Sequence, residues 1–112
     1  MNRDAVPEIT PTELNQRFSL GDVPVLVDVR EPHETAIADL PQHGQVLIPT
    51  GEFIDRVSEL DPAADIVLYC RSGQRSAWAA SILLQAGFSS VLNLRGGVLA
   101  WRADVDPTLQ AY

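Results

Sequence analysis

Residues 70–76, here called the cysteine loop, combine the residue types needed to hold and use a sulfur anion. Cys70 is the only cysteine of the chain. A cysteine reacts as its thiolate, whereas a free thiol titrates near pH ~8.5, so a reactive cysteine needs surroundings that favour the anion. The composition of the loop predicts a nucleophilic cysteine in a cradle for a small anion. The residues that follow the cysteine are Arg71, Ser72, Gly73, Gln74, Arg75 and Ser76.

Cys70 lies between a predicted strand and a predicted helix. Ile66 to Tyr69 is an apolar run typical of a buried strand, and residues 76–86 are rich in alanine and leucine, which favour a helix. Unpaired N–H groups in the first turn of a helix, together with the helix dipole, favour a negative charge there. Gly73 lets the loop curl so that its amides converge on one anion. We therefore expect a lowered pKa of Cys70, with Arg75 adding a charged donor.

Three other uses of the cysteine compete with this interpretation. A lone cysteine at a strand end is commonly a buried structural residue, but the neighbouring glycine and arginines favour a reactive one. Pairing with His33 or His43 stays open on sequence grounds, although the loop makes such a pair unnecessary. One cysteine and two histidines without ligand spacing predict no metal site.

The rest of the chain predicts strands that alternate with helices. This order is typical of a mainly parallel α/β sheet covered on both faces, in which ligands bind beyond the carboxyl ends of the strands. Thr10, Pro11 and Glu13 form the capping-box signature of a helix start. The expected strands are residues 23–29, 46–48, 66–69 and 91–94, and the expected helices run from Thr10 to Gly21, from Thr50 as cap to Asp61–Pro62, from Ser76 to Gly87 and onward from Gly96–Gly97.

Length, charge and composition limit the class of protein. The 112 residues allow one domain, for which we expect residues 1–8 as a leader and 9–112 as the folded part. The net charge of −7 disfavours nucleic acid and anionic lipid as partners. No apolar run approaches the ~20 residues of a membrane span, and the N-terminus lacks the pattern of a secretory signal. A single cysteine forms no internal disulfide, so the expected compartment is the cytoplasm.

Three motifs, in this order, resemble the rhodanese homology domain: Asp28–Val29–Arg30–Glu31–Pro32, the cysteine loop, and Arg95–Gly96–Gly97 with Trp101. The resemblance covers Ile9 to Tyr112. It implies a single α/β domain with a central, mostly parallel five-stranded sheet flanked by helices on both faces. It also implies transfer of sulfane sulfur through a persulfide on the cysteine, without a cofactor or a metal, typically with thiosulfate as donor and cyanide as acceptor.

The resemblance also implies roles for individual residues. Cys70 and Arg75 are expected to be catalytic, and Asp28 and Arg30 to brace the site by ion pairing. Arg71 is expected to attract the anionic donor. Ser72 and Ser76 are expected either to bond the cysteine sulfur or to cap the helix, and capping is the preferred interpretation for Ser76. The expected substrate-binding residues of the loop are Arg71, Ser72, Gly73, Gln74 and Ser76.

One branch of the family is especially similar. The segments around Pro49 and the ending from Val98 to Tyr112 resemble the rhodanese domains at the C-termini of adenylyltransferases that supply sulfur to molybdopterin or thiolation pathways. This similarity implies a second kind of partner, a protein that donates sulfur to Cys70 or accepts sulfur from it. Many members carry Gly-His-Ile-Pro-Gly-Ala after the first motif, whereas residues 37–44 here read Ile-Ala-Asp-Leu-Pro-Gln-His-Gly, so an altered loop is expected there.

Two rival functions use the same fold. Related cysteine phosphatases have five residues between cysteine and arginine, whereas Cys70 and Arg75 are separated by four. The shorter loop predicts a tighter cradle, which suits a terminal sulfur better than a phosphate. A non-catalytic binding module is the other rival, and the intact cysteine loop favours the enzyme.

Overall fold

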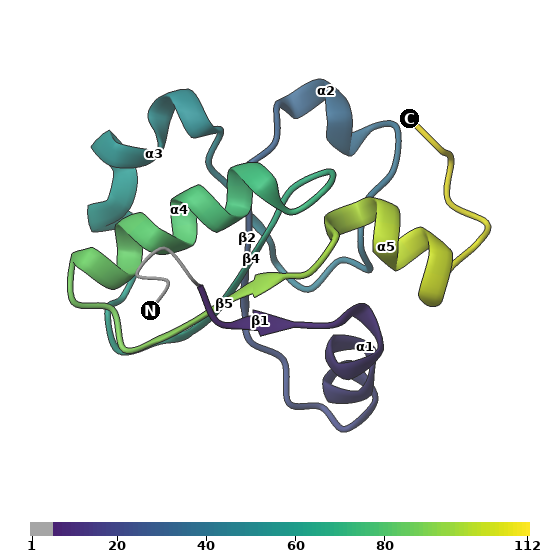
Figure 1. Ribbon diagram of the computed structural model, residues 1–112, viewed down its shortest axis with the longest axis horizontal. Helices are drawn as coiled ribbons and strands as arrows, with labels where there is room; N and C mark the ends of the chain where they lie inside the picture. The colour runs from purple at the N-terminus through teal and green to yellow at the C-terminus, as the bar shows by residue number, and fades with distance from the viewer. Residues whose placement is uncertain (1–5) are drawn as a thin grey trace.

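A parallel five-stranded sheet forms the centre of the molecule (Figure 1). The structure, a computed structural model, describes residues 6–112. The strands lie in the order β1-β5-β4-β2-β3, and every neighbouring pair is parallel. The elements are β1 (Glu8–Ile9), α1 (Pro11–Ser19), β2 (Val25–Asp28), α2 (Pro32–Thr35), β3 (Val46–Leu47), α3 (Thr50–Arg56), a 3₁₀ turn (Val57–Glu59), β4 (Asp65–Tyr69), α4 (Gln74–Gln85), β5 (Ser90–Leu94) and α5 (Gly97–Asp104).

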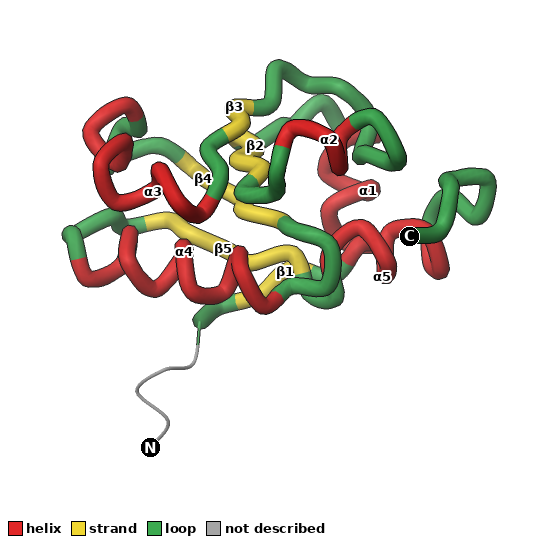
Figure 2. Tube along the Cα trace, turned by 90° about the horizontal axis from the view of Figure 1, so that it is seen from above, coloured by secondary structure: helices red, strands yellow, loops and turns green. Residues whose placement is uncertain are grey.

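Helices cover both faces of the sheet, as expected (Figure 2). Successive side chains of a strand point to opposite faces, so each buried strand feeds two cores. In β4, Ile66 and Leu68 pack with Phe53 of α3 and Leu83 of α4, and Cys70 continues this row. The alternate β4 residues Val67 and Tyr69 belong to the core on the other face, which includes Leu14 of α1 and Trp101 of α5. Cys70 therefore lies on the α3–α4 side of the sheet.

The predicted start of α1 is confirmed in detail. Thr10 is the N-cap, its hydroxyl accepts a hydrogen bond from the N–H of Glu13, and the Glu13 carboxylate accepts one from the N–H of Thr10. Pro11 occupies the first helical position. Gly21, at φ +75°, follows the end of the helix.

Several predicted boundaries were wrong. Helix α3 already includes Thr50, with Pro49 as its N-cap residue, and it gives way to a 3₁₀ turn before Asp61. Helix α4 begins at Gln74 rather than Ser76, because Gly73 at φ +97° turns the chain into the helix earlier. Glu8, assigned to the leader, pairs with Asn93 in the sheet. A two-residue edge strand has too little sequence pattern to be recognised, and residues 1–5 of the leader lie outside the described part.

The carboxyl ends of the central strands meet at one edge of the sheet. Asp28 of β2 lies beside Tyr69 of β4, and β4 lies beside β5 along its length. Cys70 follows β4 at this edge, which is where the sequence places the site. In the described part of the chain, no helix combines the length and apolarity needed to span a membrane.

Candidate active site

The sulfur of Cys70 is surrounded by hydrogen-bond donors. The N–H of Gly73 donates to Sγ at 3.1 Å, and the Ser76 hydroxyl lies 3.4 Å from it. Cys70 is 0% exposed. Burial by itself raises the pKa of the thiol, but the Ser76 hydroxyl and the backbone N–H groups of Ser76, Gly73 and Ser72 outweigh it, so the pKa is lowered. The fold thus holds this sulfur in surroundings that favour the thiolate.

Two glycines give the cysteine loop its shape. Gly73 adopts φ +97°, which only glycine reaches without strain, and this turns its N–H toward the sulfur. Gly97, at φ +59°, lies so close to the loop that a Cβ there would be 2.4 Å from the carbonyl oxygen of Cys70. Because Gly97 lies this close to the loop, the backbone N–H groups of the next two residues reach it. The N–H of Val98 donates to the Cys70 carbonyl at 2.9 Å, and that of Leu99 donates to the Arg71 carbonyl at 3.0 Å.

Arg75 does not donate to the sulfur, contrary to the prediction. Its two terminal nitrogens hold the Glu34 carboxylate at 2.8 and 2.9 Å in a forked ion pair. The hydrogen bond from Arg75 lowers the pKa of Glu34 to about 2, and the partner carboxylate raises the pKa of Arg75. Because a paired guanidinium still carries its charge, Arg75 acts on Cys70 through the electrostatic field and not through a hydrogen bond.

Arg71 contacts Tyr112, and its expected role in attracting an anionic donor stays a prediction. Its guanidinium donates through Nε, 2.6 Å from the backbone oxygen of Tyr112, and through a second nitrogen to the same oxygen. The guanidinium carbon also lies 5.2 Å from the centre of the Tyr112 ring. Arg71 therefore holds the end of the described chain beside the cysteine loop.

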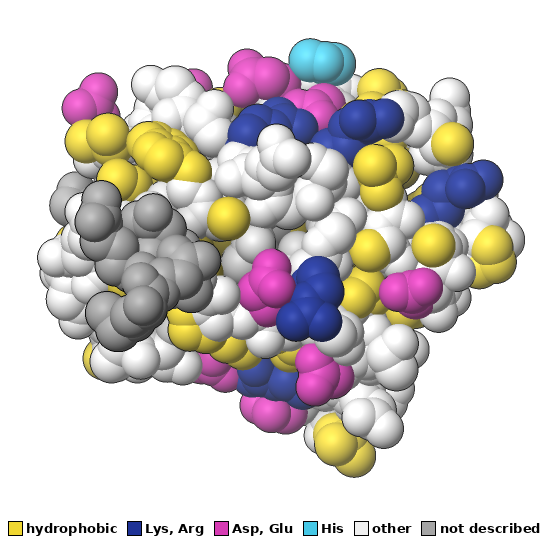
Figure 3. All heavy atoms as spheres, in the orientation of Figure 1, with side chains coloured by type: hydrophobic (Ala, Val, Ile, Leu, Met, Phe, Trp, Pro, Cys, Tyr) yellow, Lys and Arg dark blue, Asp and Glu magenta, His cyan; other side chains and the backbone are white. Residues whose placement is uncertain are grey.

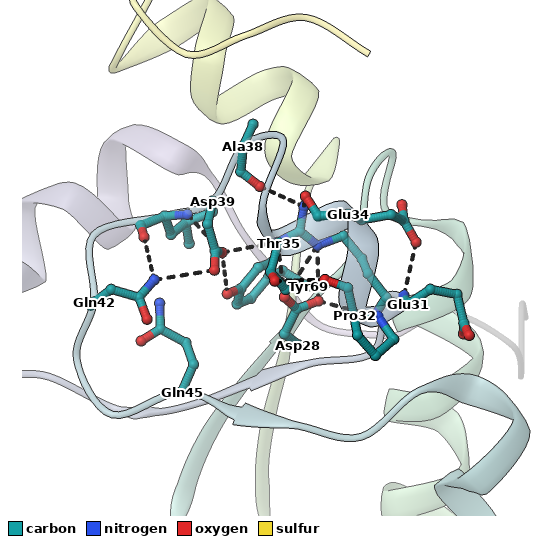
Figure 4. Close-up of polar contacts among 12 residues, drawn as sticks. Asp28, Glu31, Pro32, Glu34, Thr35, Ala38, Asp39, Gln42, Gln45 and Tyr69 are labelled. Carbon is teal, nitrogen blue, oxygen red and sulfur yellow. Dashed lines mark hydrogen bonds and ion pairs between the residues drawn. The ribbon is translucent and has the colours of Figure 1, made fainter.

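Asp28 and Arg30 form a buried ion pair, as the resemblance implied. Figure 4 shows Asp28 and Asp39 on either side of Tyr69 in this region. Arg30 is 0% exposed and also pairs with Asp39 at 3.0 Å. Burial opposes the charge of Arg30, but the hydrogen bonds to Asp28 more than compensate, and its pKa is raised. The Arg30 guanidinium donates to the Tyr112 hydroxyl at 2.7 Å, and that hydroxyl donates to Glu34 at 3.3 Å. The pair is thus connected to the Glu34–Arg75 pair.

The remaining residues of the cysteine loop act on Cys70 through either their side chains or their backbone. Ser76 is not the helix cap, because it lies in the first turn of α4, fully buried, with its hydroxyl 2.6 Å from Oδ1 of Asn93. Ser72 and Gln74 have exposed side chains. Ser72 contributes its N–H to the lowered pKa of Cys70, and Gln74 begins α4.

Neither histidine forms a pair with the cysteine. His33 is exposed on α2. The centre of the His43 ring lies 4.3 Å from that of Phe18, which packs against the core on the opposite face of the sheet from Cys70. Within residues 6–112, no three His, Cys, Asp or Glu side chains are placed to hold a metal ion. Figure 3 shows acidic side chains next to basic ones on one face of the molecule. One such ion pair joins Arg95 and Glu8 at 3.0 Å.

Sequence reasoning missed three residues of this region. Glu34 closes a capping box with the N–H of Glu31 at the start of α2, a spacing that was visible after Pro32. Asn93 is a buried polar residue within the apolar strand β5, which is a recognisable signal because buried polar groups need partners. Tyr112 offers no comparable signal, since its contacts depend on how the chain end folds back.

Comparison with known proteins identifies the family of this fold. A profile of the Rhodanese-like domain matches residues 10–104. A sulfurtransferase of Allochromatium vinosum is 43% identical over 99 residues, which are 86% of this chain and 88% of the relative. The probable adenylyltransferase/sulfurtransferase MoeZ of Mycobacterium tuberculosis is 38% identical, covering 93% of this chain but only 26% of that protein.

Solved structures share the fold. A rhodanese-like domain protein of Staphylococcus aureus has a TM-score of 0.78 at 28% identity, covering 95% of this chain and 98% of that one. An NAD-dependent persulfide reductase of A. fulgidus has a TM-score of 0.69 at 31% identity, covering 86% of this chain and 16% of that one. This chain belongs to the rhodanese-like domain family, in which its relatives include named sulfurtransferases.

Proposed function

We propose that this protein transfers sulfane sulfur through a persulfide on Cys70. The observation that carries the proposal is the hydrogen bond from the Gly73 N–H to Sγ, 3.1 Å long, at the one cysteine of a chain with sulfurtransferase relatives. In the first step the thiolate attacks the outer sulfur of thiosulfate, an S–S bond forms as the thiosulfate S–S bond breaks, and sulfite leaves with the electron pair. In the second step an acceptor nucleophile takes the outer sulfur and the thiolate returns.

The loop suits both forms of the cysteine. The amides that stabilise the thiolate also face the negative charge of a persulfide. Because Cys70 is fully buried, a donor reaches Sγ only when groups around the loop move aside. The reaction needs no cofactor beyond the covalent persulfide. We propose the cytoplasm as its compartment, because a reducing environment keeps a single thiol free.

The donor in the proposal is a small sulfur anion such as thiosulfate, or a protein persulfide. The relation to an adenylyltransferase/sulfurtransferase supports a protein donor or acceptor. The likeness to a persulfide reductase supports the persulfide itself. The expected kinetics with thiosulfate and cyanide are of the ping-pong type, because the two substrates react in separate steps.

The test is mass spectrometry of the intact protein after incubation with thiosulfate, together with a cyanide-transfer assay. The wild type should gain one sulfur atom, and cyanide should remove it with formation of thiocyanate. Cys70→Ser should gain no sulfur and show no transfer, because serine forms no persulfide. Transfer by Cys70→Ser above about a tenth of the wild-type rate, a loss of less than about 1.4 kcal/mol of transition-state stabilisation, would overturn the proposal.

The same preparation tests the phosphatase rival. With four residues between Cys70 and Arg75, the loop offers a small ring of amides, and we expect negligible hydrolysis of aryl phosphates. Inserting one residue between Gly73 and Gln74 should widen this ring and lower thiosulfate turnover about tenfold or more. A wild type that hydrolyses aryl phosphates as fast as it transfers sulfur would restore the phosphatase interpretation.

A further inference from the structure

A buried chain of polar groups runs from β5 to the sulfur. The Ser76 hydroxyl has two neighbours, Oδ1 of Asn93 at 2.6 Å and Sγ of Cys70 at 3.4 Å. Ser76 and Asn93 are 0% and 2% exposed, so water does not replace either partner. A hydroxyl has one proton to donate, and therefore serves one of these two acceptors fully at a time.

The orientation of the Asn93 amide is determined by its other neighbours. Its Nδ2 donates to the carbonyl oxygen of Gly73 at 3.1 Å and approaches the Glu8 carboxylate at 3.5 Å. Both of these groups are acceptors, so the amide nitrogen must face them and Oδ1 must face Ser76. Asn93 therefore competes with Cys70 for the Ser76 proton.

We propose that Asn93 is a positioning residue that sets which acceptor the Ser76 hydroxyl serves during the reaction. When the cysteine is a thiolate, the hydroxyl turns its proton to Sγ. When Sγ is neutral, as a thiol or as the inner sulfur of a persulfide, the hydroxyl donates to Asn93. The persulfide part of this inference rests on the proposed function.

The reason is the cost of an unpaired buried carbonyl. With the hydroxyl turned to the thiolate, Oδ1 of Asn93 loses its donor, and a buried acceptor without a partner is unfavourable. Once the negative charge has moved to the outer sulfur, the hydroxyl returns to Oδ1 and this cost disappears. Asn93 thus favours the neutral forms of Sγ, whereas the Ser76 hydroxyl favours the anion.

Three charged residues lie near the polar groups of Asn93, Ser76 and Cys70. Arg75 acts electrostatically on Cys70 and is itself paired with Glu34, and Glu8 lies on the far side of Asn93. Substitution at Ser76 leaves the contacts of Arg75 and Glu8 in place, whereas Asn93→Leu also removes the contact of Nδ2 with Glu8. A pKa change caused by this lost contact would appear equally in the Ser76→Ala background, so the double variant separates it from an effect through the hydroxyl.

The test measures the pKa of Cys70 from the ultraviolet absorbance of its thiolate, with Cys70→Ser as the blank. Ser76→Ala should raise the pKa by about one unit, because the thiolate loses a donor. Asn93→Leu should lower it by about half a unit, because the competing acceptor is gone. Ser81→Ala is the matched control, since its hydroxyl bonds the Trp78 carbonyl on the same helix, and it should leave the pKa unchanged.

The double variant distinguishes positioning from a structural role. If Asn93 acts through the hydroxyl, Asn93→Leu should have no effect on the pKa in the Ser76→Ala background. An equal shift in both backgrounds, or a raised pKa in Asn93→Leu, would overturn the inference. Circular dichroism checks folding, and Asn93→Ala repeats the measurement should the leucine variant fail to fold.

A second readout concerns the persulfide. At a fixed ratio of thiosulfate to sulfite, Asn93→Leu should hold about threefold less persulfide relative to thiolate than the wild type, matching half a pKa unit. Unchanged persulfide loading would contradict the inference. If the wild type itself forms no persulfide, the proposed function fails, while the pKa measurements still decide whether Asn93 controls the hydroxyl.

Discussion

At the scale of the residue, Cys70 shows how a buried sulfur is stabilised as an anion. Burial raises the pKa of a thiol, because a surrounding of low dielectric constant penalises charge. Hydrogen bonds from Ser76 and from the backbone of the cysteine loop reverse this effect. Neither arginine of the loop supplies such a bond, since Arg75 is held by Glu34 and Arg71 by Tyr112.

A titration of the thiolate absorbance checks this account. We predict a midpoint clearly below the value of ~8.5 for a free thiol, because donors to the sulfur favour its charged form. Subtraction of the Cys70→Ser spectrum removes the signal of the tyrosines. A midpoint at or above the free-thiol value would show that the donors do not compensate for burial.

At the scale of the element, helix α5 holds the cysteine loop in place through backbone hydrogen bonds. The N–H groups of Val98 and Leu99, at its start, hold the carbonyls of Cys70 and Arg71. These carbonyls reach the helix only because Gly97 has no side chain. The turn before α5 therefore serves as a strand-to-helix connection and as one wall of the loop.

Gly97→Ala should accordingly destabilise the protein and distort the loop. The new Cβ would lie 2.4 Å from the Cys70 oxygen, at φ +59° where an alanine is strained, so we expect a loss of about 3 kcal/mol or more in the free energy of unfolding. Urea unfolding measures this loss. Gly51→Ala is the matched control, because a Cβ there meets no atom within 4 Å, and its stability should stay close to that of the wild type.

At the scale of the whole molecule, ion pairs join segments that are distant in sequence. Glu34 of α2 pairs with Arg75 of α4, and Tyr112 bridges Arg30 and Glu34 from the end of the chain. The Glu34 side chain is 9% exposed, so this pair is shielded from solvent on one side. Removing one partner of such a pair costs more than breaking a surface salt bridge, because the other charge is left partly buried without a partner.

The pair makes stability depend on pH. The pKa of Glu34 is lowered from 4.5 to about 2 in the folded protein, so its stabilisation is complete above pH 4.5 and is lost as pH falls toward 2. Glu34→Gln should therefore cost about 2 kcal/mol at pH 7, and the difference from the wild type should shrink below pH ~4.5. Urea unfolding across this range measures the trend.

Glu59→Gln provides the comparison on the surface. Glu59 pairs with Arg56 at 2.8 Å on an exposed helix turn, where solvent screens the interaction. Loss of this ion pair should change the free energy of unfolding little at any pH. A difference between Glu34→Gln and the wild type that is constant with pH would contradict the assignment of a lowered Glu34 pKa.

The sequence by itself determined the fold and the place of Cys70 at the end of a strand. Alternating apolar strands and helical segments specify a parallel sheet through local periodicity, and the motif around Cys70 specifies a loop between strand and helix. The short edge strand β1 was not predicted, because two residues are too few to show the alternation of apolar and polar side chains that marks a strand. The start of α4 was placed two residues late, since the left-handed turn at Gly73 is a backbone property that composition shows only weakly.

Only the tertiary structure decided which partner each polar side chain takes. Glu34, Asn93 and Tyr112 come from three separate segments, and the parallel packing brings them to the edge of the sheet beside the cysteine loop. A long, charged side chain such as Arg75 pairs with whichever acceptor lies within its reach. That choice depends on distances across the fold, which sequence spacing does not encode.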